Sequence, residues 1–407
     1  MRWLTAICGC AVAWLLLASP AFGAANPKLS VTGADLVVAG TGQQLYSVDP
    51  NRELPIASTT KLMTVLVTLQ HVRNLNETFT QYDWRPAPVD SQIGLVPGER
   101  MTVHDLLVAL LLPSADDAAM DLAYNVGGRS VARFVAMMNA EAAALHLEHT
   151  HYSTPSGLDT PGNYSSPADL VRLAGYVLRF SPFVRRTVAL PSATLYSGRY
   201  VRHVTNTDDL VGRVRWITGV KTGHTTDAGY VLVTSGSRDG MTLIGSVLGA
   251  QSEEARDDNA LALLDYGFAA YHQVTPVRLG QLLRRPAVSW SSSRAVVVAA
   301  GGFQEIVPRS DRVSVKVRVP AQLSGPMPRG ARVGTASVVV GRQTAAEIPL
   351  ELAHALPAVS LISRAGQILR RPSTLILLAL ALAAAVTATR LWRRRPRAVA
   401  SRHLEER

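Results

Sequence analysis

Lysine is scarce in this chain. Only four of the 407 residues are lysine, against 37 arginines. Arginine stays protonated at physiological pH, whereas a buried lysine can lose its proton, so a chain with so little lysine is expected to keep it where an amine is needed. Two of the four, Lys61 and Lys221, end the stretch Ser-Thr-Thr-Lys (58–61) and begin the stretch Lys-Thr-Gly (221–223).

Cysteine is missing from nearly the whole sequence. The only two, Cys8 and Cys10, lie in an apolar run over residues 3–17, which follows Arg2 and precedes small residues at 19–25. This pattern predicts a secretory signal peptide over residues 1–25, and the short run with its cleavage-like end argues against the alternative of an uncleaved anchor. The mature chain would then contain no cysteine, which excludes disulfides and thiol chemistry.

The body of the chain lacks a strong charge of either sign. The net charge is +11, but Arg2 adds one positive charge and residues 358–407 carry ten arginines and two glutamates, which leaves about +2 for residues 27–357. No basic stripe with interleaved aromatic residues is visible there. We therefore expect no nucleic-acid partner.

An apolar run near the C-terminus predicts a membrane anchor. Residues 373–392 are long enough to cross about 30 Å of hydrocarbon. More arginines follow this run than precede it, which predicts a cytoplasmic tail over 393–407 and a body on the extracytoplasmic side of the cell membrane. Apolar residues at helical spacing within 358–372 predict a juxtamembrane amphipathic segment, with a plain charged linker as the alternative.

Two domains are expected between these ends. Residues 26–274 show strands, then helices, then strands, which predicts an α/β (α+β) domain with an antiparallel sheet and a helical layer. Valines alternate with polar residues over 313–319, and this and similar runs predict a small all-β domain over 275–357. The expected strands of the first domain are 35–39, 43–48, 194–203, 230–235 and 242–248, and its expected helices are 60–70, 103–112, 116–124, 131–145 and 167–179.

The Ser-x-x-Lys stretch can carry nucleophilic chemistry. Ser58 at the start of a helix, as its N-cap, and Lys61 one turn later would share a face, and the helix N-terminus would favour a developing oxyanion. Lys61 acts as a base only if its pKa falls, which burial and a second cation such as Lys221 would achieve. Ser-x-x-Lys is a weak signal by itself, but it is strong when combined with Lys-Thr-Gly.

A third element lies between these two. Ser114-Ala115-Asp116 stands at the head of a predicted helix, where Ser114 could also be an ordinary N-cap. Ser-x-x-Lys, a Ser-x-Asn type element and Lys-Thr-Gly, in this order, are typical of penicillin-binding proteins and class A β-lactamases.

The sequence resembles the D-alanyl-D-alanine carboxypeptidases, the low-molecular-mass penicillin-binding proteins, over about residues 30–355. The resemblance includes Ala-Ser-Thr-Thr-Lys-Leu-Met-Thr (57–64), Pro-Ser-Gly-Leu (155–158) and Gly-Val-Lys-Thr-Gly-His-Thr (219–225). It implies a serine penicillin-binding, β-lactamase-like transpeptidase fold with a C-terminal β domain and membrane anchor. It also implies action on peptidoglycan stem peptides, acylation by β-lactams, and no cofactor or metal.

The resemblance implies roles for particular residues. Ser58 would form an acyl-enzyme with the penultimate D-alanine, Lys61 would take its proton, and Ser114 would relay a proton to the leaving D-alanine. Lys221 and Thr222 would hold the terminal carboxylate, and the backbone N–H groups of Ser58 and His224 would form the oxyanion hole. The substrate-binding residues would be Lys221, Thr222, Gly223, His224 and Asp116.

Asp116 departs from the family pattern, which has asparagine there. An ionised carboxylate only accepts hydrogen bonds, and beside the two lysines it would oppose the fall of the Lys61 pKa. The alternative is that Asp116 caps the following helix and points away from the pocket. We favour the placement beside the lysines.

Other groups of polar residues give weaker evidence of a functional site. The histidines at 146, 149 and 151 straddle a predicted helix end without an acidic cluster, which favours a solvated loop over a metal site. The aspartate pairs at 208–209 and 257–258 are interpreted as turn and helix-surface charge. No phosphate-binding glycine loop or dinucleotide motif is visible.

Two other functions remain as alternatives to a carboxypeptidase. A β-lactamase-like hydrolase would share the acylation groups, but no Glu-x-x-Leu-Asn stretch for deacylation lies between residues 114 and 221. A non-catalytic peptidoglycan-binding protein could keep the fold while Asp116 impairs turnover. Release of D-alanine and turnover of nitrocefin would separate the three.

Overall fold

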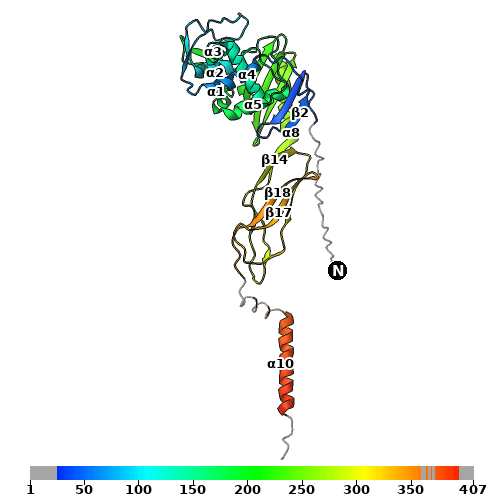
Figure 1. The fold of residues 1–407 in the computed structure, drawn as a ribbon. Helices are drawn as coiled ribbons and strands as arrows, with labels where there is room; N and C mark the ends of the chain where they lie inside the picture. The colour runs from blue at the N-terminus through cyan, green and yellow to red at the C-terminus, as the bar shows by residue number, and fades with distance from the viewer. Residues whose placement is uncertain (1–24, 359–363, 365–367, 369–371, 394–407) are drawn as a thin grey trace, which may run out of the picture. The chain divides into compact units, whose positions relative to one another are not determined.

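The computed structural model describes residues 25–358, 364, 368 and 372–393 (Figure 1). It divides the chain into two compact units, residues 1–274 with 306–310, and residues 275–305 with 311–407. The predicted signal peptide, most of the juxtamembrane segment and almost the whole basic tail lie outside the described residues.

An antiparallel sheet of five strands organises the first unit, in the order β2-β1-β9-β8-β7. The strands predicted over 35–39, 43–48, 230–235 and 242–248 are confirmed, and the edge strand β7 was not predicted. The five strands are β1 (Gly33–Val38), β2 (Gln44–Val48), β7 (Ile217–Thr225), β8 (Gly229–Arg238) and β9 (Met241–Ala250).

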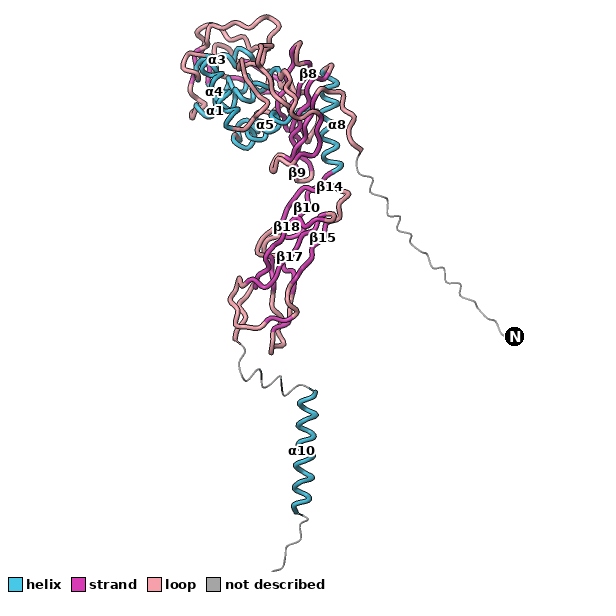
Figure 2. Tube along the Cα trace, turned by 45° about the vertical axis from the view of Figure 1, so that its right-hand side comes forward, coloured by secondary structure: helices cyan, strands magenta, loops and turns pink. Residues whose placement is uncertain are grey.

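Helices cover both faces of this sheet because side chains of a strand alternate between its faces. On β9, Ile244 points toward Gly175 of α5 (Pro167–Phe180), while a Cβ at Gly245 would meet Leu263 of α8 (Glu253–Ala270). Figure 2 shows α5 and α8 on the two sides of the strands. From the sequence, only a helix surface at 257–258 was expected within α8.

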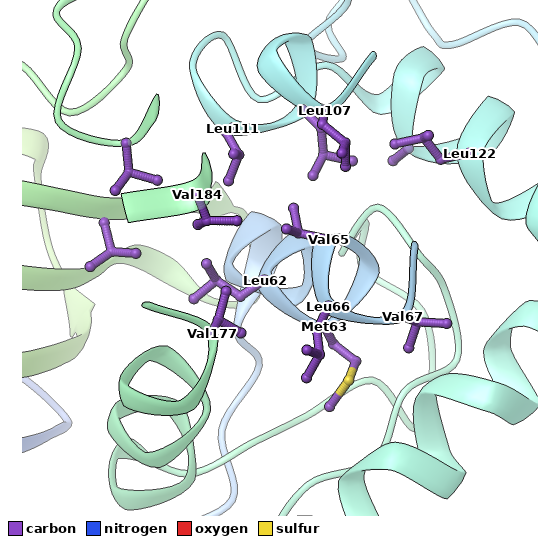
Figure 3. Packing of buried hydrophobic residues seen from close by; sticks show 14 of the residues in the cluster. Leu62, Met63, Val65, Leu66, Val67, Leu107, Leu111, Leu122, Val177 and Val184 are labelled. Carbon is purple, nitrogen blue, oxygen red and sulfur yellow. The ribbon is translucent and has the colours of Figure 1, made fainter. Parts of the chain in front are cut away.

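The helical layer lies on the α5 side, with α1 (Lys61–His71) at its centre. Leu62, Met63 and Leu66 of α1 are fully buried and pack among side chains of α2, α3, α5 and α6 (Figure 3). The other helices of the unit are α2 (Val103–Leu111), α3 (Asp116–Val126), α4 (Val131–Ala144), α6 (Pro182–Thr187) and α7 (Leu210–Arg213). The helices predicted over 103–112, 116–124, 131–145 and 167–179 are confirmed as α2, α3, α4 and α5.

The predicted single strand over 194–203 is wrong. It is a hairpin of β5 (Ser192–Leu195) and β6 (Arg202–Thr205), and the chain reverses around Gly198 at a φ of 97°. A Cβ at this glycine would lie 2.5 Å from a carboxylate oxygen of Glu99. The turn therefore depends on a tertiary contact. A second small hairpin pairs β3 (Thr78–Thr80) with β4 (Arg100–Thr102).

The second unit contains the expected C-terminal β domain. Five strands pair in the order β11-β13-β18-β17-β15, and Val313, Val315 and Val317 alternate with more exposed residues on β15. Its five sheet strands are β11 (Leu282–Arg284), β13 (Val297–Ala299), β15 (Val313–Arg318), β17 (Arg332–Val340) and β18 (Gln343–Leu352). A shorter pair in this unit is β12 (Ala287–Val288) with β16 (Gln322–Leu323). The strands β10 (Tyr271–Val277) and β14 (Phe303–Pro308) form a separate pair that belongs to neither unit alone.

A long apolar helix, α10 (Pro372–Arg393), follows the β domain in the chain. Its stretch Pro372–Arg390 has a mean hydropathy of 1.9 and is long enough to cross a membrane. The sequence predicted this helix over 373–392.

Candidate active site

Ser58 lies in a tight turn at the junction of the sheet and the helical layer. The turn is a 3₁₀ helix (Ala57–Thr60) that leads into α1, and Ala57 has a φ of 48°. Ser58 is not the N-cap that the sequence predicted, because its hydroxyl makes no capping bond and the cap positions are Ile56 and Thr60. The Ser58 hydroxyl is therefore left for other contacts.

Two glycines allow the chain to close around this turn. A Cβ at Gly157 would lie 2.0 Å from the Ala57 carbonyl oxygen, and a Cβ at Gly223 would lie 3.0 Å from the Ser58 nitrogen. Only a residue without a side chain fits so close to a neighbouring backbone. The loop over 155–158 and strand β7 thus hold Ser58 from two sides.

Lys61 is fully buried directly behind Ser58. Its Nζ donates hydrogen bonds of 2.7 Å to Ser58 Oγ and 2.7 Å to the Ser156 carbonyl, and lies 2.6 Å from Asp116 Oδ1. Burial lowers the pKa of Lys61 and the Asp116 carboxylate opposes this shift. Burial likewise raises the pKa of Asp116, opposed by the Lys61 ammonium.

The ion pair decides between the two placements considered for Asp116. The carboxylate faces Lys61, and its helix, α3, has no side-chain cap at its N-cap residue Ala115. The alternative in which Asp116 caps the helix and points away is therefore wrong. Ser114 is not the N-cap either.

Ser114 itself is buried at the cleft in a strained conformation. Its φ is 65°, a region that non-glycine residues seldom occupy, and its hydroxyl has no hydrogen-bond partner in the described part of the chain. Strain of this kind is concentrated at functional sites, where the surrounding structure holds it in place. The free hydroxyl is available to a bound molecule.

Strand β7 supplies the second lysine. Lys221 is buried, and its Nζ donates a 3.0 Å hydrogen bond to the Thr222 carbonyl. Burial, and next the nearby charge of Lys61, hold its pKa well below the usual value. Thr222 Oγ1 lies 2.6 Å from Thr207 Oγ1, and His224 is exposed with its ring stacked on Tyr230.

A cleft of about 790 Å³ lies at these residues, with Lys61 and Lys221 buried outside its lining. The sequence predicted six of the residues that line it, Ser58, Ser114, Asp116, Thr222, Gly223 and His224. It missed the loop over 89–91 and also Thr207, Glu253 and Arg256, which line the cleft from segments far away in the chain. Within the part of the chain that the structure describes, no group of three or more His, Cys, Asp or Glu side chains could hold a metal ion.

The interpretation of the aspartate pairs is wrong in one member of each pair. Asp208 and Asp257 are buried, whereas Asp209 and Asp258 are exposed as expected. Asp257 contacts the buried Arg256 guanidinium at 2.8 Å. The spacing of residues in the sequence could not predict the burial of Asp208 and Asp257, because the packing of α8 against the sheet produces it.

The arrangement defines a class of enzyme. A hydroxyl contacts a buried amine whose pKa is lowered, a second buried lysine precedes a threonine of the cleft wall, and a helical layer packs on an antiparallel sheet. These features define a serine acyl-transfer enzyme of the penicillin-binding type.

Comparison with known proteins narrows this class to one family. Residues 21–252 match the family model of the peptidase S11 D-alanyl-D-alanine carboxypeptidases. The chain belongs to this family, and it is a serine-type D-Ala-D-Ala carboxypeptidase that acts on peptidoglycan peptides.

Individual relatives agree with this assignment. A D-alanyl-D-alanine carboxypeptidase of Streptomyces sp. strain K15 is 35% identical over 267 residues, which cover 62% of this chain and 92% of the relative. The carboxypeptidase DacA of Escherichia coli K12 is 27% identical over 345 residues, covering 81% and 85%. The crystal structure of penicillin binding protein 5 from Haemophilus influenzae, 24% identical, shares the fold with a TM-score of 0.63 over 82% of this chain and 99% of that protein.

Proposed function

We propose that Ser58 is the nucleophile and Lys61 its general base. The observation that carries the proposal is the 2.7 Å contact between Ser58 Oγ and the fully buried Lys61 Nζ. When Lys61 is neutral, the same contact lets the amine accept the hydroxyl proton as Ser58 attacks.

The reaction then follows from the positions of the remaining groups. Ser58 Oγ bonds to the carbonyl carbon of the penultimate D-alanine, and the backbone N–H groups of Ser58 and His224 stabilise the oxyanion. Gly223 supports this assignment because it brings β7 against the Ser58 nitrogen. The C–N bond to the terminal D-alanine breaks as Ser114 passes a proton to the leaving amine. Water hydrolyses the ester, releases the shortened peptide and restores the Ser58 hydroxyl.

The terminal carboxylate of the substrate binds at β7. Lys221 supplies a buried positive charge and Thr222, the next residue on β7, supplies a hydroxyl in the wall of the cleft. The same groups bind the carboxylate of a β-lactam, which acylates Ser58. Asp116 modulates the site through Lys61 and does not itself bind the substrate carboxylate, since two anions repel.

The chain is anchored in the cytoplasmic membrane by α10 as a single-pass protein, after removal of a signal peptide over 1–25. The domain over 26–274 is the catalytic domain, and it lies on the extracytoplasmic side with the β domain over 275–357. The arginine excess after α10 supports this orientation, and residues 393–407 form the cytoplasmic tail.

Mass spectrometry of the intact protein with penicillin tests the proposed nucleophile. We expect a single covalent adduct, located on Ser58, and release of D-alanine from a pentapeptide. Ser58→Ala should lose both, while Ser153→Ala, a serine outside the cleft lining, should keep both. A full adduct in Ser58→Ala would show that another residue is the nucleophile.

A further inference from the structure

Three buried basic side chains either line the cleft or adjoin a residue that lines it, and two of them contact a carboxylate directly. Lys61 contacts Asp116 at 2.6 Å, and Arg256 contacts Asp257 at 2.8 Å and Glu253 at 3.1 Å. Within the described residues, Lys221 makes no such ion pair, and the Thr222 carbonyl is its hydrogen-bond acceptor. A buried ammonium without an anion is costly, so the charge on Lys221 needs support from elsewhere.

Asp208 is a buried carboxylate that forms no ion pair among the described residues. It is 1% exposed, and neither of its carboxylate oxygens makes a hydrogen bond of good geometry with the residues that the structure describes. Its field acts on Lys221, where it favours the charged form. A buried carboxylate with two unsatisfied oxygens requires an explanation beyond packing.

The backbone holds Asp208 beside the cleft wall. The preceding residue, Thr207, bonds to Thr222 on β7 at 2.6 Å, and its N–H donates to the Leu112 carbonyl at 3.0 Å. The Asp208 N–H donates to Asn206 Oδ1 at 2.9 Å. The segment is thus fixed to the residue that follows Lys221 in the chain.

We propose that Asp208 is the counter-ion of Lys221, a positioning residue that keeps the Lys221 ammonium charged so that it can bind the substrate carboxylate. This rests on the carboxylate-binding role proposed for Lys221. Asp208 does not touch the substrate. It acts through the lysine by the charge of its carboxylate.

The charges on the surrounding elements agree with this role. Lys61 and Arg256 oppose the charge on Lys221, whereas Asp116 and Asp208 support it. Burial raises the pKa of Asp208 to about 7, with Asp257 and Asp209 adding to the shift and Arg256 opposing it. Asp208 therefore becomes ionised as pH rises through about 7. Burial lowers the pKa of Lys221, and the ionised Asp208 carboxylate opposes this shift.

Substitution of Asp208 by asparagine tests the proposal, because asparagine keeps the shape and removes the charge. The pH profile of kcat/KM for D-alanine release reports the ionisations of the free enzyme. We expect its alkaline, falling limb to move to lower pH in Asp208→Asn, with KM at pH 9 raised at least about tenfold and kcat changed less than about twofold, since a nearby opposite charge typically shifts an ionisation by about one unit or more. The exposed Asp258 on α8 gives a control, because its charge is not among those that shift the pKa of Asp208 or Lys221, and Asp258→Asn should keep the wild-type limb.

Repeating the Asp208 substitution in the Lys221→Arg variant separates an electrostatic effect of Asp208 from a structural one. Arginine stays charged at all pH values used, so in Lys221→Arg the further change Asp208→Asn should not move the alkaline limb. If Asp208→Asn does not fold, Asp208→Ser, which leaves room for a water, takes its place. An unshifted limb in the folded single variant, or an equal shift in the Lys221→Arg background, would overturn the proposal. The penicillin adduct on Ser58 at pH 7 is measured alongside, so that loss of the nucleophile is distinguished from loss of the counter-ion.

Discussion

Replacing Asp116 by asparagine should make Lys61 a more effective base. The carboxylate lies 2.6 Å from Lys61 Nζ, and both side chains are buried. An ionised Asp116 favours the charged form of Lys61, which cannot accept the Ser58 proton. Asparagine has nearly the same shape and carries no charge, so Lys61 loses its proton more readily and acylation at neutral pH becomes faster.

The size of the effect follows from the burial of Lys61 and Asp116. Breaking a buried ion pair typically costs about 3–5 kcal/mol when the remaining charge stays buried. Lys61 can avoid most of this cost by releasing its proton, so we expect the loss in unfolding free energy to be smaller. An opposite charge this close typically shifts an ionisation by about one to three pH units, and each unit changes the neutral fraction tenfold. We therefore expect penicillin acylation at pH 7 to accelerate by about tenfold or more.

The assay is the second-order rate of acylation by penicillin, measured from pH 5 to pH 10. The rising limb of the profile should move to lower pH in Asp116→Asn. Asp121 provides the control, because it is a second buried carboxylate on α3, accepts hydrogen bonds from Tyr82 and Asn125, and does not contact Lys61. Asp121→Asn should leave the rising limb unchanged.

A slower reaction would refute this reasoning. If Asp116→Asn acylates more slowly at every pH with an unshifted limb, the carboxylate serves as a required acceptor in the site. If rate and limb are both unchanged, Lys61 is neutral in the wild-type protein despite its partner.

Three further changes test other parts of the account. Lys61→Arg should reduce D-alanine release nearly as much as Lys61→Ala, because guanidinium is no base at neutral pH. Lys221→Arg should keep part of the activity and mainly raise KM, because the role of Lys221 is electrostatic. Equal losses of activity in both arginine variants would contradict this division of roles. A chain ending after Pro357 should be soluble after export and still form the penicillin adduct, and alkaline carbonate should not extract the full chain; its quantitative extraction would show that residues 372–390 do not span the membrane. Burial raises the pKa of Asp35 to about 6, so the folded chain holds this proton to higher pH than the unfolded chain and Asp35 costs stability as pH rises from about 4 to about 6. Asp35→Asn should therefore raise the unfolding free energy at pH 8 by up to about 3 kcal/mol and leave it nearly unchanged at pH 4, as measured by urea denaturation; the same gain at both pH values would mean that ionisation is not the cause.

The sequence by itself determined the features that depend on nearby residues. The apolar run over 373–392 has the length of a membrane span, and the periodicity around Leu62 and Leu66 places one face of α1 in the core. Scarcity of lysine singled out Lys61 and Lys221. These signals are local because helix periodicity, membrane length and residue chemistry are properties of short segments.

Tertiary structure decided where charges are buried and what they contact. The orientation of Asp116 depends on how α3 meets α1, and the burial of Asp208 and Asp257 depends on α8 and the sheet. The hairpin around Gly198 depends on Glu99, about a hundred positions earlier in the chain. No spacing rule predicts such contacts, because the energy of a buried charge is set by the distance to its partner in space, and residues far apart in the sequence supply that partner.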